Sequence, residues 1–280
     1  MTVAEDEAGF RALLEQVAGA RGFSCANYKD GCLRRRIAVR MRACGVTTYR
    51  EYAAVLTRDA AEYDRLVEVL TINVTRLYRD AEVWDAFAER VLPALWELGG
   101  PRFVAWSAAC SSGEELYTLA ALLHRHAERT GTLRRLAQTE VIGTDIDDPS
   151  LKKAARGVYA DADFTEVPAA LRQRYFRPQA EDGVTMHAAV PELRTMVRTQ
   201  HRDLLSESAP ASGVQLITCR NVMIYFDRKS QEPLLQRFHD ALLPGGVLVL
   251  GKVETLIGPS RALFEVVDQR QRIFRRPVAA

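Results

Sequence analysis

The sequence contains no run of about 20 consecutive apolar residues, the length that a helix needs to cross a bilayer. Its first seven residues are rich in acids and lack the apolar core of a secretory signal. The five cysteines are irregularly spaced and form no Cys-x-x-Cys pair, which argues against a disulfide framework or a zinc site. We therefore expect a cytoplasmic protein with reduced thiols, no metal site and no insertion into a membrane.

An excess of positive charge is also missing from the chain as a whole. The 38 lysines and arginines are balanced by 36 aspartates and glutamates, which leaves +2, and a protein that coats nucleic acid carries a stronger positive balance. With 280 residues, 48% hydrophobic and 26% charged, the composition is that of a globular protein. The length suits one large domain or two small ones.

The near-neutral total conceals a strongly basic stretch near the start of the chain. Across residues 21–50, eight basic residues accompany one acid, Asp30, so the local charge is 8 − 1 = +7. Such a stretch attracts an acidic partner, or it is a solvated helix with internal salt bridges. Nucleic acid is a rival partner, but only Tyr28 and Tyr49 are near to stack on bases. The basic residues are Arg21, Lys29, Arg34, Arg35, Arg36, Arg40, Arg42 and Arg50.

Residues 7–98 show the helical spacing of apolar side chains and no strand-like alternation. For example, Leu33, Ile37 and Met41 fall on one narrow face of a helix. The run Gly99-Gly100-Pro101 ends the last helix. We therefore predict a helical domain over residues 1–98. Its helices are expected around Phe10–Val17, over Tyr28–Cys44, after a cap at Thr47 or Thr48, over Asp64–Leu70 and over Asp80–Leu98.

After Pro101 short apolar strands alternate with helices, which predicts an α/β domain over residues 99–280 with a parallel, Rossmann-like sheet and helices on both faces. A small antiparallel insertion is expected at about residues 160–202, with short strands at Val184–His187 and Thr195–Thr199. The expected strands are Arg102–Trp106, Glu140–Asp145, Val214–Cys219, Val247–Gly251 and a closing hairpin at Phe264–Asp268 and Gln271–Phe274. The expected helices are Glu114–His126, Asp148–Arg156 and Lys229–Leu243.

Polar residues stand where these strands end, and open α/β sheets bind ligands beyond those ends. The run Ser107–Glu115 has small residues that let a ligand approach, although it is not Gly-x-Gly-x-x-Gly and is alternatively only a capped turn. Asp145 ends the next strand, where an acid can hold the hydroxyls of a ribose. Its alternative role is to cap the following helix, for which Asp147 or Asp148 is better placed.

A third polar group, Arg220 and Asn221, follows a buried strand and therefore needs partners or a ligand. Tyr225 is placed to present its hydroxyl to the same site, or it packs on the sheet. The acids Glu114 and Asp145 suit a neutral or cationic nucleoside better than a phosphate-bearing one. S-adenosylmethionine carries a sulfonium and no phosphate, so it fits this pattern better than NAD does.

Together these segments resemble the chemotaxis-receptor methyltransferase family, CheR, over nearly the whole chain. Each motif is moderately specific, and the order and spacing make the combination very specific. The resembling segments are Tyr28-Lys29, Leu33–Arg36, Arg40–Arg42, Leu70–Thr75 with Arg79-Asp80, Ser107–Glu115, Thr144–Asp147 and Cys219–Phe226.

The resemblance implies a class I methyltransferase fold and S-adenosylmethionine-dependent O-methylation of glutamates on the cytoplasmic coiled-coil helices of chemoreceptors. The reaction converts S-adenosylmethionine to S-adenosylhomocysteine. The protein is expected to be a monomer. Arg79 is implied to orient the substrate carboxylate, and Tyr225 to line the transfer channel. The implied cofactor-binding residues are Asn73, Thr75, Arg79, Glu114, Asp145, Asp203, Leu204, Arg220 and Asn221. The implied receptor-docking residues are Arg34, Arg35, Arg36, Arg40 and Arg42.

Three departures from the family pattern stand out. Gly251-Lys252-Val253-Glu254 replaces the frequent Gly-x-Ser-Glu, Tyr78 replaces a common Phe, and residues 177–184 offer a single glycine for a receptor-tethering loop. We therefore expect recognition of the receptor helix without a tether. Two other functions remain open: a CheR-like sensor that only holds the cofactor, and a methyltransferase of the same fold acting on nucleic acid.

Overall fold

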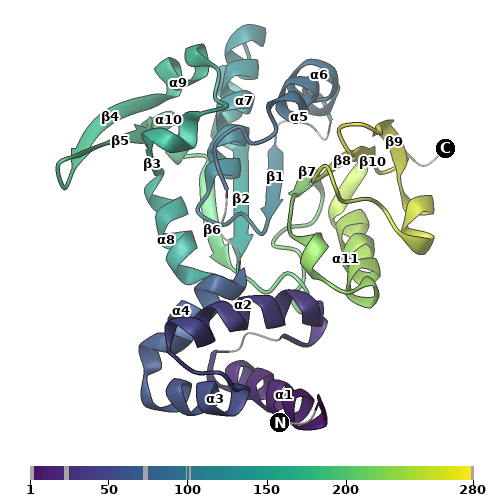
Figure 1. Ribbon diagram of the computed structural model, residues 1–280. Coiled ribbons are helices and arrows are strands. Elements are labelled where there is room, and N and C mark those ends of the chain that lie inside the picture. The colour runs from purple at the N-terminus through teal and green to yellow at the C-terminus, as the bar shows by residue number, and fades with distance from the viewer. Residues whose placement is uncertain (1–2, 22–24, 72–74, 99, 101, 279–280) are drawn as a thin grey trace. The chain divides into compact units, whose positions relative to one another are not determined.

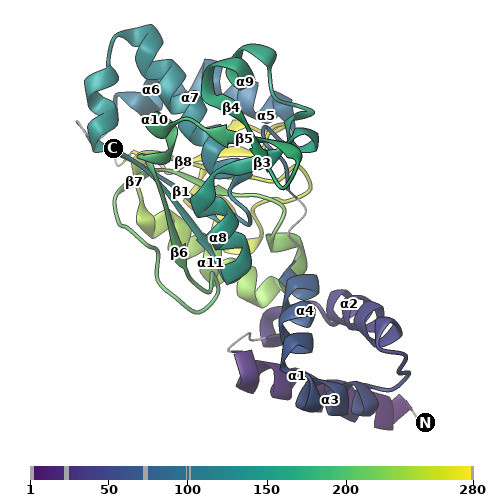
Figure 2. The ribbon, with the colours of Figure 1, turned by 90° about the vertical axis from the view of Figure 1, so that its left-hand side faces the viewer.

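The computed structural model describes residues 3–21, 25–71, 75–98, 100 and 102–278 (Figure 1; turned by 90° in Figure 2). The chain divides into two compact units. The first comprises residues 1–73 and 225–230, and the second comprises residues 74–224 and 231–280. The structure thus differs from the expected boundary at residue 98, because the helices that precede it pack into the core of the second unit.

In its described residues the first unit contains the α-helices α1 (Val3–Arg21), α2 (Asp30–Ala43), α3 (Tyr49–Arg58) and α4 (Ala60–Thr71). Burial of Leu33, Ile37 and Met41 confirms the apolar face that their spacing predicts for α2. Of the two expected caps of α3, Thr47 and Thr48, the structure shows Thr48. Its hydroxyl accepts the Glu51 N–H at 3.2 Å, and the Glu51 carboxylate accepts the Thr48 N–H at 2.9 Å.

A short segment from much later in the chain completes this unit. Phe226 forms an antiparallel bridge with Tyr28, and their rings meet edge to face with 5.1 Å between centroids. The Lys29 N–H donates to the Tyr225 carbonyl at 2.9 Å, and the Asp227 N–H donates to the Asn27 carbonyl at 3.0 Å. Residues 225–230 therefore belong to the fold of the helical unit, although they follow a strand of the other.

The second unit contains a seven-stranded sheet in the order β6-β2-β1-β7-β8-β10-β9. Strands β6, β2, β1, β7 and β8 run parallel, and β10 is antiparallel to β8 and β9, which confirms the predicted sheet and closing hairpin. The strands are β1 (Phe103–Ala108), β2 (Thr139–Asp145), β6 (Val197–His201), β7 (Val214–Cys219), β8 (Leu242–Leu250), β9 (Glu265–Asp268) and β10 (Ile273–Arg275).

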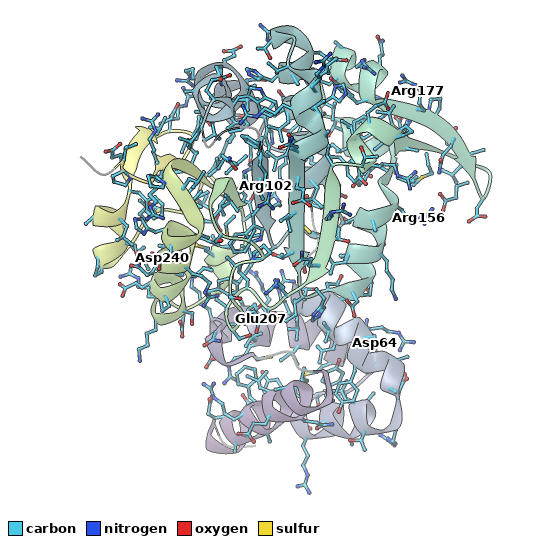
Figure 3. All side chains as sticks on the ribbon, turned by 180° about the vertical axis from the view of Figure 1, so that it is seen from behind. Asp64, Arg102, Arg156, Arg177, Glu207 and Asp240 are labelled. Carbon is cyan, nitrogen blue, oxygen red and sulfur yellow. The ribbon has the colours of Figure 1, made fainter. Side chains whose placement is uncertain are left out.

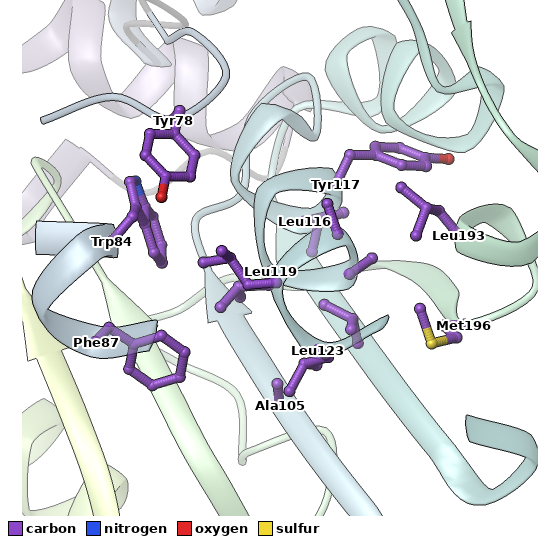
Figure 4. Close-up of a cluster of buried hydrophobic side chains, with 14 of the residues drawn as sticks. Tyr78, Trp84, Phe87, Ala105, Leu116, Tyr117, Leu119, Leu123, Leu193 and Met196 are labelled. Atoms are coloured by element: carbon purple, nitrogen blue, oxygen red, sulfur yellow. The ribbon is translucent and has the colours of Figure 1, made fainter. Parts of the chain in front are cut away.

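Helices cover both faces of the sheet. Alternate side chains of β1 point to opposite sides, and all of them are buried, so each face needs a covering layer. On one side Phe103 meets Trp96 at 5.2 Å between ring centroids, and on the other Trp106 meets Phe238 at 5.3 Å. Figure 4 shows the first cluster, in which Ala105 lies beside the apolar face of a long helix. The helices are α5 (Ala81–Ala86), α6 (Leu92–Trp96), α7 (Glu114–Thr130), α8 (Asp148–Arg156) and α11 (Arg228–Ala241).

The expected single helix over Asp80–Leu98 is divided in the structure. A π-helical segment, Phe87–Val91, separates α5 from α6. Pro93 is the second residue after it and has no N–H to donate to the preceding turn, so the regular ladder is broken there. The buried face of this segment is nevertheless continuous and includes Trp84 and Trp96.

The small insertion is a three-stranded antiparallel sheet in the order β3-β5-β4. Asp182 and Gly183 form its hairpin turn, both with positive φ (51° and 76°), as in type I′ turns. Arg156 of α8, labelled in Figure 3, pairs with Glu181, the residue that precedes this turn. The elements of this region are β3 (Val158–Ala160), α9 (Ala169–Tyr175), β4 (Phe176–Glu181), β5 (Val184–Ala189) and α10 (Pro191–Arg194).

The prediction of a short antiparallel strand over Thr195–Thr199 was wrong. That segment contributes to β6, which pairs parallel with β2 at the edge of the main sheet. The Val141 N–H also donates to the Met196 carbonyl at 2.8 Å, so the backbone before β6 is already held by β2. Within the described part of the chain, no helix combines the length and apolar character needed to span a membrane.

Candidate functional site

The turn from β1 to α7 is a tight, strained loop at the carboxyl end of the sheet. Ala109, Ser111 and Gly113 all have positive φ, at 61°, 49° and 90°, a region that residues other than glycine rarely adopt. A Cβ on Gly113 would lie 2.7 Å from the Cβ of Ala154, so only glycine allows α8 to approach this turn. Such concentrated backbone strain is typical of ligand-binding loops.

Asp145 lies at the tip of β2 and is held by this turn. Its Oδ2 accepts the Ser111 N–H at 2.8 Å, and its Oδ1 accepts the Asp147 N–H at 3.0 Å. Burial raises the pKa of Asp145 despite these hydrogen bonds. Each carboxylate oxygen has capacity to accept a further hydrogen bond. Of Asp147 and Asp148, the two expected caps of α8, the structure shows Asp147, whose side chain accepts the Ser150 N–H at 3.1 Å.

Glu114 is the first residue of α7, and it is only 5% exposed. Burial raises the pKa of its carboxyl to about 7, although the Ser112 hydroxyl donates to it at 2.9 Å. Among the described residues, no lysine or arginine forms an ion pair with Glu114. A buried acid of this kind is stabilised in its ionised form by a cationic ligand.

These two acids provide the test of fit for S-adenosylmethionine. Glu114 and Asp145 both lie at the β1 and β2 ends of the sheet, linked through the turn that contains Ser111 and Ser112. A phosphate group would be repelled by two buried carboxylates, whereas a sulfonium and an ammonium are attracted. The residues present therefore fit a cationic nucleoside, and Asp145 is suited to ribose hydroxyls.

Asp203 and Leu204 follow β6 and lie beside the Asp145 strand, since the Arg202 N–H donates to the Asp145 carbonyl at 2.9 Å. The Asp203 side chain accepts the Leu205 N–H at 2.9 Å, which closes a local turn. Arg237 of α11 donates to the Leu204 carbonyl at 2.6 Å. The structure therefore brings this predicted pair to the same end of the sheet as Asp145.

Arg220 is buried, and its guanidinium bonds to protein groups. It donates to the Arg79 carbonyl at 2.9 Å, to Asp80 at 2.7 Å and to Glu115 at 3.3 Å. It also lies over the Trp84 ring, 4.9 Å from its centroid. These contacts favour support of the Arg79 segment, and direct cofactor contact by Arg220 stays a prediction.

Glu115 is a site residue that the sequence reasoning did not single out. It accepts hydrogen bonds from Ser107 on β1 at 2.7 Å and from Thr218 on β7. It thereby joins two strands beneath Arg220. The sequence does contain a signal for this contact. Glu115 is the second residue of a helix, and Ser107 and Thr218 are polar residues close to the ends of two apolar strands.

The segment around Arg79 is strained and firmly held. Tyr78 and Asp80 have positive φ of 59° and 61°, and Trp84 donates its ring N–H to the Arg79 carbonyl at 2.9 Å. Thr75 is partly buried in the same unit. The predicted contact Asn73 lies outside the described residues.

Two of the departures from the family pattern have partners in the structure. The hydroxyl that Tyr78 adds donates to Asp85 at 2.8 Å. Lys252 forms ion pairs with Asp80, at 3.5 Å, and with Glu82. Both added groups are therefore accommodated by acids of the same unit.

The predicted docking arginines and Tyr225 belong to the helical unit. Arg34 pairs with Glu7 and stacks on the Phe10 ring, 3.8 Å from its centroid. Arg36 lies over the Tyr225 ring, 5.6 Å from its centroid. The role of Tyr225 in transfer stays a prediction.

Arg40 binds Glu62 with two hydrogen bonds, of 2.8 and 2.7 Å, although Glu62 is 1% exposed. Arg35 and Arg42 are exposed and lie seven residues apart on α2, with the exposed Val39 between them. Of the five predicted docking arginines, these two are presented most openly on the helix surface.

Comparison with known families agrees with this geometry. The CheR methyltransferase all-alpha domain matches residues 8–71, and the CheR methyltransferase SAM-binding domain matches residues 73–273. The chain belongs to the CheR methyltransferase family. As a member of this family it is an S-adenosylmethionine-dependent methyltransferase, with a class I methyltransferase sheet and an all-helical N-terminal domain.

Curated relatives of this CheR methyltransferase cover most of its length. A chemotaxis protein methyltransferase of Listeria monocytogenes is 34% identical over 239 residues, which are 85% of this chain and 87% of the relative. A chemotaxis protein methyltransferase of Klebsiella aerogenes is 32% identical over 264 residues, which are 92% of this chain and 87% of the relative.

Proposed function

We propose that this CheR methyltransferase methylates glutamate side chains on the cytoplasmic helices of chemoreceptors, giving methyl esters for sensory adaptation. The observation that carries the proposal is the match of both domains to CheR, together with relatives named chemotaxis protein methyltransferases. Because these receptor helices lie in the cytoplasm, we propose that the enzyme acts there. We also propose that it acts as a monomer.

The cofactor site in this proposal is the carboxyl end of β1, β2, β6 and β7. Asp145 holds the ribose hydroxyls, and Glu114 faces the positive charge of the cofactor. Asp203 and Leu204 border the adenine. When bound, S-adenosylmethionine supplies a methyl group made electrophilic by the sulfonium. The remaining proposed contacts are Asn73, Thr75, Arg79, Arg220 and Asn221.

The chain's own residues have little proton chemistry to perform. A glutamate carboxylate is ionised at neutral pH, so no general base is required. Catalysis then rests on placing that carboxylate in line with the methyl group. We assign the orientation of the carboxylate to Arg79, whose backbone is fixed by Arg220 and Trp84. Tyr225 is proposed to line the path of transfer.

The acidic receptor helix is proposed to bind the exposed face of α2. Arg35 and Arg42 are separated by two helical turns, which is about 10 Å at 1.5 Å per residue. The exposed Val39 between them offers an apolar contact. Chemoreceptor coiled coils are rich in Glu and Gln, and their glutamates supply the complementary charge.

A methyl-transfer assay tests the proposal directly. Labelled S-adenosylmethionine is incubated with the enzyme and with cytoplasmic fragments of chemoreceptors, and alkali-labile methyl esters are counted. Label in receptor fragments, lost when the methylated glutamates are changed to alanine, is the expected result. Cofactor binding without transfer to any receptor fragment would contradict the proposal and favour a sensor. Label in RNA or DNA would favour the nucleic-acid alternative.

A further inference from the structure

Glu254 is a buried carboxylate at the cofactor end of the sheet whose function has not yet been assigned. It stands just after β8 and is 4% exposed. Its Oε2 accepts the Gly251 N–H at 2.7 Å and the Asn221 N–H at 2.9 Å. One oxygen atom therefore joins the loop that follows β7 to the loop that follows β8.

The backbone at Asn221 and at Gly251 is suited to these two hydrogen bonds, which together are called the Glu254 clamp. Asn221 has a φ of 62°, in the left-handed region that few residues adopt without support. A Cβ on Gly251 would lie 2.6 Å from Glu254 Oε2 and 2.8 Å from the Asn221 nitrogen. Any larger residue at position 251 would therefore separate the carboxylate from the backbone that it holds.

The negative charge of Glu254 is costly at this buried position, although backbone N–H groups offset part of the cost. Burial raises the pKa of Glu254, and this effect exceeds that of the surrounding backbone N–H groups. Its Oε1 has no hydrogen-bond partner in the described part of the chain. The basic residues that adjoin the two loops in sequence pair with other acids, Arg220 with Asp80 and Glu115, and Lys252 with Asp80 and Glu82. Among the residues that the structure describes, no ion pair with Glu254 is formed, and a buried acid without a counter-ion lowers stability.

We propose that Glu254 is a positioning residue that fixes Asn221 for contact with the cofactor. The carboxylate holds the Asn221 backbone in its left-handed conformation, and Gly251 leaves room for the bond. The inference rests on the cofactor role proposed for Asn221, and it does not depend on which protein accepts the methyl group.

The first test compares affinity with stability in Glu254→Gln. Glutamine keeps the size of the side chain but brings an amide donor among backbone donors and removes the charge. We expect binding of S-adenosylhomocysteine, measured by calorimetry, to weaken about tenfold, while the thermal midpoint stays equal or rises. The matched control is Glu265→Gln on the exposed edge strand β9, which should change neither quantity.

Two results would overturn the inference. Unchanged affinity in Glu254→Gln would show that the clamp does not serve the cofactor. A parallel loss of affinity and thermal midpoint would show that Glu254 acts only in folding. Because wild-type cofactor binding is measured without a receptor, both results are distinct from a failure of the proposed substrate.

A double-mutant cycle tests whether Glu254 acts through Asn221. If it does, Glu254→Gln combined with Asn221→Ala should bind S-adenosylhomocysteine no more weakly than Asn221→Ala alone. Additive losses would contradict the positioning role. Gly251→Ala offers a second way to open the clamp, because its Cβ would displace the carboxylate, and it should reproduce the affinity loss of Glu254→Gln.

Discussion

At the scale of single residues, the two acids of the cofactor site differ in their surroundings. Asp145 accepts two backbone N–H groups, whereas the ionised form of Glu114 is supported by a serine hydroxyl. Asp145 is therefore suited to orient neutral hydroxyls. The carboxyl of Glu114 is suited to pair with a positively charged group of the ligand.

Replacing Asp145 with alanine should weaken cofactor binding strongly. The variant loses the acceptor for two ribose hydroxyls, and hydrogen bonds to charged groups contribute about 1.5–3 kcal/mol each, so an affinity loss of at least about tenfold is expected. Calorimetry with S-adenosylhomocysteine measures this, and circular dichroism checks that the fold is intact. Unchanged affinity in a folded variant would refute the ribose assignment.

Cofactor affinity should depend on pH through Glu114, whose pKa is about 7. Below that pH the carboxyl is mostly neutral, and above it the carboxylate can pair with a cation. We therefore expect the affinity for S-adenosylmethionine, which carries the full positive charge of the cofactor, to rise about tenfold from pH 6 to pH 8. The measurement is calorimetry across this range, with Glu114→Gln as the control in which the rise disappears.

The same pKa fixes the sign of a stability effect. Because the folded-state pKa of Glu114 lies above its unfolded value, its contribution is fully present below about pH 4.5 and is lost as pH rises through 7. The cofactor-free enzyme should thus lose stability over that window more than Glu114→Gln does. A thermal midpoint with the same pH slope in both proteins would contradict the burial of this acid.

The role of a single residue could be predicted from the sequence when it depends on neighbouring residues in the same segment. Asp145 at a strand end and Asp147 at a helix start are both local patterns, and the cap at Asp147 is confirmed. Arg220 was singled out from the sequence as needing a partner, but its partners, like those of Glu115 and Glu254, come from other strands and loops. Such a partner is set by the tertiary fold and leaves no spacing in the sequence.

At the scale of elements, α2 combines two kinds of arginine that the sequence does not distinguish. Arg34, Arg36 and Arg40 bind groups of their own unit, whereas Arg35 and Arg42 are exposed. Burial would raise the pKa of Glu62, but hydrogen bonds from Arg40, Tyr52 and Arg65 outweigh it and lower the pKa to about 2. Arg40 is therefore primarily part of the core.

Arg40→Ala should destabilise the helical unit by about 3 kcal/mol, because it leaves the buried Glu62 without its bidentate partner. Thermal or urea unfolding measures the loss. The matched control is Arg42→Ala on the same helix, which should stay within about 0.5 kcal/mol of wild type. Equal effects in the two variants would contradict the distinction between core and surface arginines.

The spacing of apolar residues predicted some helix and strand boundaries correctly and others wrongly. The helix over Asp148–Arg156 and the strand over Val214–Cys219 were predicted with their observed bounds. The helix over Asp80–Leu98 was predicted without its π segment, and β6 was assigned to the wrong sheet. A short apolar run does not reveal which neighbour will pair with it.

At the scale of the whole molecule, charge is distributed unevenly, with +7 in residues 21–50 and +2 overall. We expect kcat/KM for receptor fragments to fall as salt rises, because exposed charges are screened over about 10 Å at 0.1 M salt. In Arg35→Glu/Arg42→Glu this salt dependence should be lost and the rate reduced. Arg50→Glu/Arg58→Glu on α3 changes the net charge equally and should keep the slope.

The discontinuous helical unit has a consequence for how the protein is made. Its main part ends at residue 73, and its final segment begins at residue 225, which is 225 − 73 = 152 positions later. At about 5–20 residues per second, roughly 8–30 seconds of translation separate the two. During that interval the ribosome-bound helices lack Phe226, which forms an isolated β-bridge with Tyr28. Chaperone access should therefore concentrate on this unit, and a fragment ending at residue 73 should expose the ring of Tyr28 that Phe226 covers.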